Sequence, residues 1–153
     1  MRHSIWWLLF CSIAVTAAAP LTGYFATDNS GTLYVNGQLV ATSTTFTVAT
    51  PFSTAAEIGD VVAFAGVNSG GPAGVLLTLY FQNEAILTDR TWRCSTVCPA
   101  GWHLNAFDDS LWPFAWAYYS NQGVLYPILP GARAAQWIWT ELLLDIQTIC
   151  CRQ

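Results

Sequence analysis

Short alternating runs of apolar and polar residues, separated by turn residues, fill the chain from residue 30 to residue 87. In the first of these runs, Asn36-Gly37 predicts a two-residue hairpin turn between two strands. The strands predicted by alternation or by short apolar runs cover residues 32–36, 38–41, 44–49, 60–68, 75–81 and 85–88, with Pro51 ending the third. Short strands at this spacing predict a β-sandwich or a barrel.

The second half of the chain has a different pattern. Tryptophan recurs from residue 92 to residue 139, interleaved with Pro, Gly and Asn, and regular strands are predicted only over residues 136–140 and 146–152. Aromatic side chains each bury a large area, so they can hold an irregular backbone against a sheet. We therefore expect a Trp-rich irregular segment packed on the sandwich. No linker separates the halves, which predicts one domain over residues 18–153.

The first residues read as an export signal. Arg2 and His3 precede an apolar run over residues 5–15, and the small residues 16–19 follow. The run is shorter than the roughly 20 apolar residues that span a bilayer. Residues 1–17 are therefore predicted to be a signal peptide, and the protein to be secreted without membrane insertion.

Charge is scarce and negative. Only 9% of the 153 residues are charged, lysine is absent, and the net charge is −4. Nucleic acids and anionic membranes select basic patches, so they are poor candidates as partners. An extracellular glycan or an extracellular protein is the partner we expect.

Four cysteines follow the predicted signal peptide, and secretion makes disulfides the expectation. They allow three pairings, among which the sequence alone does not choose. Bridges within each close pair are disfavoured, because neighbouring side chains in a strand point apart. We favour Cys94–Cys151, which would tie the middle of the chain to its last strand and leave Cys98 and Cys150 for a second bridge. A zinc site through Cys94 and Cys98 is the rival interpretation, and it lacks a good fourth ligand.

Five segments in a fixed order resemble the galactose-binding-like jelly-roll family. The segments cover residues 33–37, 58–63, 68–74, 101–112 and 135–152, and the resemblance extends over roughly residues 24–152. The family includes sugar-binding accessory modules of glycoside hydrolases and extracellular animal domains. The resemblance implies a jelly-roll sandwich in which residues 101–112 place a loop against the sheets, and it favours a lectin-like module without catalytic activity. An extracellular structural or matrix protein that acts by protein–protein association is the alternative.

The adjacent acids Asp108 and Asp109 invite a catalytic or a calcium-binding interpretation. Glycoside hydrolysis needs two carboxylates that face one bond, whereas neighbouring side chains diverge. In domains of the resembling family this motif is structural: an Asp caps a turn and Trp112 fills the core. We favour that role, with calcium binding as the alternative and no cofactor required.

Two other features have a catalytic interpretation that the sequence does not favour. His103 would have to serve any Ser–His or Cys–His mechanism, but no Gly-x-Ser-x-Gly occurs and disulfides would consume the thiols. The glycine-rich residues 66–74 lack the Gly-Lys-Ser/Thr ending of a phosphate-binding loop, so a turn between strands explains them better.

Aromatic residues in the irregular segment are the best candidates for a binding site. Packing in the core is expected for Trp112, and for Trp137 or Trp139. Exposed aromatic clusters often mark binding sites, and sugars are commonly held by aromatic faces. The predicted ligand-binding residues are Trp116, Tyr118, Tyr119 and Asn121.

Overall fold

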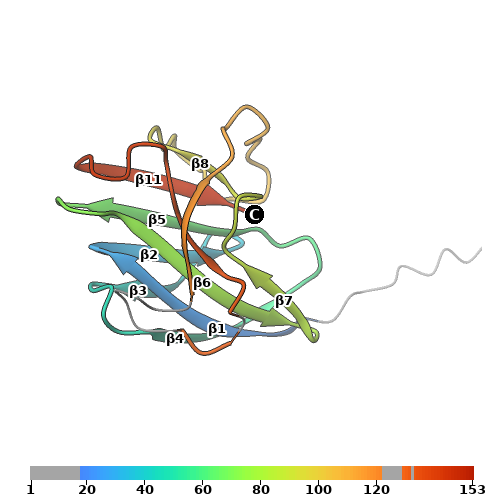
Figure 1. The fold of residues 1–153 in the computed structure, drawn as a ribbon. Helices are drawn as coiled ribbons and strands as arrows, with labels where there is room; N and C mark the ends of the chain where they lie inside the picture. The colour runs from blue at the N-terminus through green and yellow to red at the C-terminus, as the bar shows by residue number, and fades with distance from the viewer. Residues whose placement is uncertain (1–17, 122–128, 132) are drawn as a thin grey trace, which may run out of the picture.

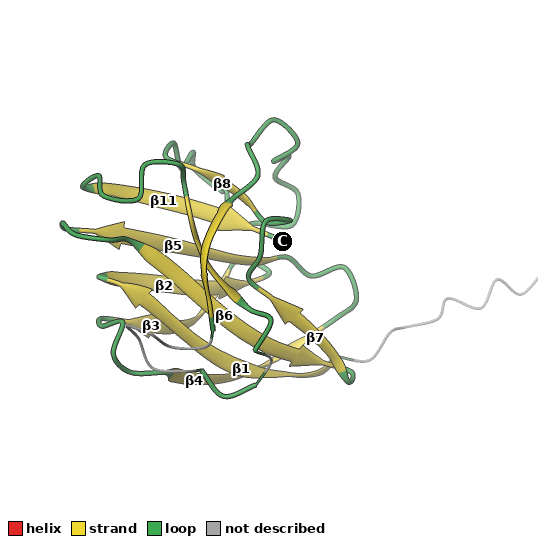
Figure 2. Cartoon of the chain, in the orientation of Figure 1, coloured by secondary structure: helices red, strands yellow, loops and turns green. Residues whose placement is uncertain are grey.

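The structure is a computed structural model that describes residues 18–121, 129–131 and 133–153. Within these residues the protein is all-β, with two antiparallel sheets packed into a sandwich (Figures 1 and 2). This confirms the predicted fold class. The predicted signal peptide lies outside the described residues. In the described part of the chain, no helix is long and apolar enough to cross a membrane.

Each sheet ends at a short strand from the second half of the chain. The six-stranded sheet has the order β4-β1-β6-β10-β9, with β7 also paired to β6, and the five-stranded sheet has the order β3-β2-β5-β11-β8. The strands of the six-stranded sheet are β1 (Ala19–Asp28), β4 (Thr50–Ala56), β6 (Gly74–Phe81), β7 (Glu84–Leu87), β9 (Trp116–Ser120) and β10 (Gln136–Trp139). The other five are β2 (Ser30–Val35), β3 (Gln38–Ser43), β5 (Val62–Asn68), β8 (Arg93–Ser95) and β11 (Gln147–Arg152).

The core lies between the two sheets and is built from the apolar positions that alternation predicted, together with aromatic residues of the second half. The Phe64 ring of β5 lies between the rings of Phe25 in β1 and Trp92 and is tilted to both, with ring centres 6.5 and 5.3 Å apart. Trp92 and Trp139 are the largest fully buried side chains. The indole nitrogen of Trp92 donates a hydrogen bond to the Leu87 carbonyl at 2.8 Å, which compensates for its burial.

The structure confirms the turns that local signals predict. Asn36 and Gly37 both have positive φ, 46° and 76°, as a hairpin turn of the predicted kind requires. The glycine-rich residues 68–74 form a turn between β5 and β6, in which the Asn68 side chain donates to the Gly71 carbonyl at 3.0 Å. Strands β10 and β11 fall where residues 136–140 and 146–152 predicted them.

The strand predicted over residues 44–49 is wrong, and the strand instead covers Thr50–Ala56. Side chains in the predicted segment and just before it bond locally: Ser43 Oγ, at the end of β3, donates to the Thr45 carbonyl, and the Thr45 and Thr47 hydroxyls lie 2.8 Å apart. Such bonds compete with strand pairing. Pro51 does not end a strand but lies inside β4, which tolerates it because β4 is at the edge of its sheet.

Strand β1 and the edge strands β8 and β9 were not predicted. β1 lies in the middle of its sheet, between β4 and β6. Its Gly23 is opposite Leu79 of β6, and a Cβ atom at this position would overlap the backbone of Thr78 and Leu79. A glycine and a proline within residues 19–28 weaken the alternation that would have marked a strand.

The segment between β8 and β9 packs on the outside of the five-stranded sheet, as the resemblance implied for residues 101–112. Trp102 is buried there against Ala63 and Cys150, with Phe107 and Trp112 beside it. The expectation that Trp112 fills the core is wrong: it is half-buried in this outer cluster. Trp137 and Trp139 are both buried, as expected.

Candidate functional site

A concave surface that involves the predicted site residue Trp116 lies where the two edge strands β8 and β9 approach each other. A hollow of about 400 Å³ lies between β8, the segment that leads into β9, and the residues that follow β10. It is lined by Cys94, Ser95, Thr96, Pro113, Phe114, Trp116, Thr140, Glu141 and Leu142. We call it the first hollow.

A second hollow, of about 440 Å³, lies beside the first and shares Phe114 and Trp116 with it. Its other lining residues are Arg90, Ala115 and Ala117. Phe114 is 58% exposed and Trp116 is 56% exposed, whereas Ala115 between them is buried. The two aromatic side chains therefore form an exposed ridge with a hollow on either side. We call it the aromatic ridge.

Backbone pairing with β8 fixes the position of the aromatic ridge. The Cys94 amide donates to the Pro113 carbonyl at 3.0 Å, and the Ala115 amide donates to the Trp92 carbonyl at 2.7 Å. The guanidinium of Arg93 lies 4.4 Å from the centre of the Phe114 ring, close enough for a cation–π contact. The ridge is thus held on an edge strand of each sheet.

Hydrogen bonds also hold the opposite wall of the first hollow, formed by residues 140–142. The Tyr118 hydroxyl donates to the Thr140 carbonyl at 2.6 Å. The Gln147 side-chain amide donates to the Leu142 carbonyl at 2.7 Å and to the Thr140 hydroxyl at 3.0 Å. Glu141, between these anchored residues, is exposed and lines the hollow.

Two disulfides, Cys94–Cys151 and Cys98–Cys150, flank the third wall of the first hollow, which contains Ser95 and Thr96. The first is the bridge we favoured, and the second is the one it left possible. Ser95 and Thr96 lie between the bridged cysteines, and the Ser95 hydroxyl donates to the Val97 carbonyl at 2.9 Å. The hydroxyl-bearing side of the hollow is therefore tied to β11.

The four predicted ligand-binding residues have different positions. Trp116 belongs to the aromatic ridge. Tyr118 is half-buried and supports the hollow through Thr140, and Tyr119 is 47% exposed but lines neither hollow. Asn121 is buried, and its side chain both donates to the Leu129 carbonyl and accepts from the Leu129 amide.

Phe114, Arg90 and Glu141 are site residues that the sequence analysis missed. The pattern Phe114-Ala115-Trp116, in which a small residue separates two large aromatic ones, is a signal that an alternating strand can present both aromatics outward. Arg90 and Glu141 are separated from this pattern by long stretches of sequence, and no local signal connects them to it.

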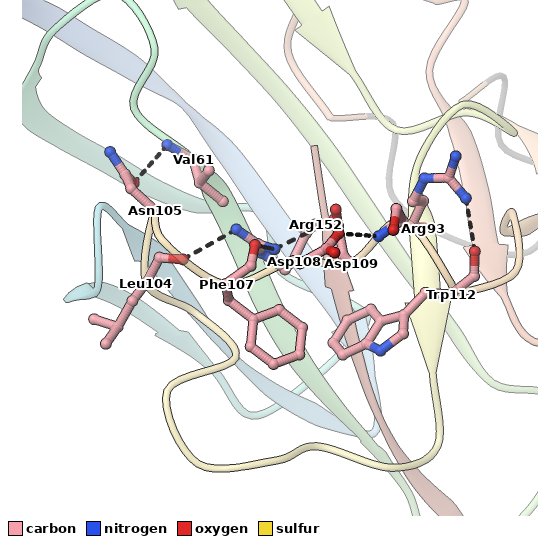
Figure 3. Close-up of polar contacts among 10 residues, drawn as sticks. Val61, Arg93, Leu104, Asn105, Phe107, Asp108, Asp109, Trp112 and Arg152 are labelled. Atoms are coloured by element: carbon pink, nitrogen blue, oxygen red, sulfur yellow. Dashed lines mark hydrogen bonds and ion pairs between the residues drawn. The ribbon is translucent and has the colours of Figure 1, made fainter.

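Asp108 and Asp109 are part of the structure of the packed loop rather than of the hollows (Figure 3). Asp108 accepts a hydrogen bond from the Ser110 amide at 2.9 Å, and Asp109 lies 3.5 Å from the buried Arg152 guanidinium. Bonds from the Ser110 backbone and side chain, with a smaller contribution from Arg152, lower the pKa of Asp108. This is the turn-capping role we favoured. Among the described residues no group of three or more His, Cys, Asp or Glu is arranged to hold a metal ion.

His103 is packed among aromatic rings. Its ring centre lies 4.8 Å from that of Tyr34 and 5.5 Å from that of Trp102. Its Nδ1 atom is buried without a hydrogen-bond partner in the described part of the chain. The arrangement gives His103 a packing role.

Tyr118 provides a direct test of how the wall is held. Burial, followed by the negative charges of Glu141 and Tyr119, raises the pKa of Tyr118. Tyr118→Phe is expected to lower the free energy of unfolding by about 1 kcal/mol, because the Thr140 carbonyl loses its donor. Because the pKa of Tyr118 is raised in the folded state, the difference in stability between the wild type and Tyr118→Phe is expected to be fully present below a pH of about 10. It is lost as the pH rises through the folded-state pKa.

Denaturant unfolding of the wild type and the variant between pH 7 and pH 11 measures both effects. Tyr119→Phe is the matched control, since no hydrogen bond of its hydroxyl occurs in the described structure. A Tyr118→Phe variant as stable as the control at neutral pH would contradict the prediction.

Comparison with known proteins gives a structural match and no sequence match. No protein-family model matches the chain, and no curated protein matches it. The structure is similar to that of a lectin from Pleurotus ostreatus in complex with GalNAc, with a TM-score of 0.66 and 27% identity over 76% of this chain. The apo form of the Pleurotus ostreatus lectin gives a TM-score of 0.65 and 26% identity over 78% of this chain.

The chain spans 39% of the first lectin chain and 38% of the second. The sandwich is therefore similar to a lectin fold. The more particular resemblance to the galactose-binding-like family stays a prediction.

Proposed function

We propose that this is a secreted, non-catalytic, lectin-like protein that binds carbohydrate in the first hollow, against the aromatic ridge. The observation that carries the proposal is the exposure of Trp116 and Phe114 opposite fixed polar groups. A sugar ring has an apolar C–H face and an edge of hydroxyl groups. Aromatic faces suit the former, and the Glu141 carboxylate and the hydroxyls of Ser95, Thr96 and Thr140 suit the latter.

The structural neighbours support the same function. One of them was solved in complex with GalNAc, and it shares 27% of aligned residues with this chain. The two disulfides are compatible with an extracellular protein, since such bonds persist in oxidising compartments. GalNAc and oligosaccharides that contain it are therefore the first probes to use.

Glycan binding by the full chain, produced through an oxidising secretory pathway, tests the proposal. Trp116→Ala is expected to weaken binding by at least about tenfold, as truncation of a central aromatic contact does in many interfaces. Ile58→Ala is the matched control, because Ile58 is also exposed (71%) and lines neither hollow.

Two results would overturn the proposal. One is the absence of binding to any glycan by folded protein with both disulfides intact. The other is selective glycan binding that Trp116→Ala and Ile58→Ala leave equally unchanged, which would place the site elsewhere.

Association with itself or with other extracellular proteins is the second candidate function. It is favoured by three exposed apolar side chains between β10 and β11: Leu142, Leu144 and Ile146, which are 51%, 66% and 78% exposed. Sedimentation over a range of concentrations distinguishes the two functions. Assembly that Leu144→Ser and Ile146→Ser abolish, without glycan binding, would favour association.

A further inference from the structure

The second hollow carries a positive charge that has no partner within the described structure. Arg90 lines this hollow and is exposed, and it makes no hydrogen bond or ion pair with any described residue. The acid next to it in the sequence, Asp89, bonds to Thr91 instead: its Oδ1 atom accepts hydrogen bonds from the Thr91 amide at 2.7 Å and from the Thr91 hydroxyl at 2.5 Å. The Arg90 guanidinium is therefore available to a ligand.

Charges of opposite sign lie on the two sides of the aromatic ridge. Arg90 belongs to the second hollow and Glu141 to the first, while Phe114 and Trp116 line both. Arg93, against the Phe114 ring, adds positive charge near the ridge. A ligand that crosses the ridge and carries one negative group consequently has a preferred orientation, with that group at Arg90 and away from Glu141.

We propose that the glycan bound at this site is acidic, and that its carboxylate or sulfate group is held by Arg90 in the second hollow. This proposal rests on the proposed function. A neutral sugar of the same glycan occupies the first hollow, with its apolar face on the ridge and its hydroxyls near Glu141. Guanidinium groups bind carboxylate and sulfate oxygens through two parallel N–H donors, so Arg90 selects the anionic substituent.

The overall charge of the protein narrows the ligand class further. The net charge of −4 opposes the approach of densely charged polyanions. Among the described residues that line the two hollows, Arg90 is the single basic one. The site thus suits a glycan with one acidic group among neutral sugars rather than a heavily sulfated chain.

The test compares three oligosaccharides that differ in one group: a neutral GalNAc-containing oligosaccharide, the same compound with one carboxylate, and the same compound with one sulfate. Affinities are measured by calorimetry on the full disulfide-bonded chain. The wild type is expected to bind at least one acidic compound about tenfold more tightly than the neutral one, with a preference that decreases as salt is added. The acidic compound that binds more tightly identifies the substituent.

Arg90→Gln is expected to abolish the preference, so that the variant binds the acidic compound no more tightly than it binds the neutral one. Arg133→Gln removes the same charge from an exposed arginine that lines neither hollow, and it is expected to change neither affinity. Neutral binding that Trp116→Ala weakens, without any preference for an acidic compound, would overturn this proposal and leave the proposed function standing. Loss of preference in Arg133→Gln as well as in Arg90→Gln would also overturn it, because the effect would then be one of net charge. Binding of none of the three compounds by folded protein with both disulfides intact would overturn this proposal, whereas the proposed function falls only if no other glycan binds either.

Discussion

Replacement of Cys94, Cys98, Cys150 and Cys151 by alanine is expected to lower the free energy of unfolding by about 6 kcal/mol, whereas loss of either disulfide alone is expected to lower it by about 2 kcal/mol. The two bridges are nested, with sequence separations of 57 and 52 residues. Either bridge alone closes the long loop in the unfolded chain, and this contributes about 4 kcal/mol to the free energy of unfolding in the chain-entropy model. The other then closes only a ring of a few residues, worth about 2 kcal/mol in the same model.

Denaturant unfolding of the wild type, the two double variants and the quadruple variant measures this non-additivity. Alanine keeps the buried positions Cys94, Cys150 and Cys151 apolar, so the comparison reports mainly on the crosslinks. If either double variant alone lost as much stability as the quadruple variant, the nested-loop explanation would be wrong.

Replacement of Arg152 is expected to have the second largest effect on the free energy of unfolding, after removal of both disulfides. Arg152 is 3% exposed, and its guanidinium donates to the Phe107 carbonyl at 2.7 Å and to the Leu104 carbonyl at 3.0 Å (Figure 3). It also lies 5.3 Å from the centre of the Phe107 ring. Arg152→Met is expected to lower the free energy of unfolding by about 3 kcal/mol, since two carbonyl groups lose a charged donor in a buried setting.

The partner acid offers a matched control for this prediction. Asp109 is 29% exposed and lies 3.5 Å from the guanidinium, so Asp109→Asn is expected to change stability by less than about 1 kcal/mol. Unfolding is measured together with limited proteolysis of the segment between β8 and β9, which should be cut faster only in Arg152→Met. Equal stability of the two variants would show that Arg152 does not hold this segment.

The sequence was sufficient to predict those parts of the fold that depend on local signals. Asn36-Gly37 favours the positive φ angles that a hairpin turn requires. The apolar runs of β5 and β6 predict buried strands without knowledge of the neighbouring strands. Residues 44–49 misled the prediction because alternation of Thr with apolar residues also suits a segment held by local hydroxyl bonds. β9 was missed since it pairs with β10 through a β-bulge, where the register shifts.

The candidate site was less predictable than the fold. Trp116 was recognisable by its aromatic neighbours in the sequence, but these neighbours turned out to have separate positions. Tyr118 supports a wall of the hollow and Asn121 is buried against Leu129. The partners of Trp116 in the hollows come from β8, from the residues after β10 and from Arg90, and only the pairing of distant strands brings them together.

Disulfides and hydrogen bonds hold the walls of the first hollow, and this affects how a ligand would bind there. Ser95 and Thr96 lie between two cysteines that are both joined to β11, and the facing wall is anchored by Tyr118 and Gln147. Residues constrained in this way have little conformational entropy left to lose when a ligand arrives, so more of the contact energy is retained as affinity. The surface is preorganised, so a ligand is expected to bind there without rearrangement of the protein. Differences in affinity between ligands should then come mainly from their dissociation rates.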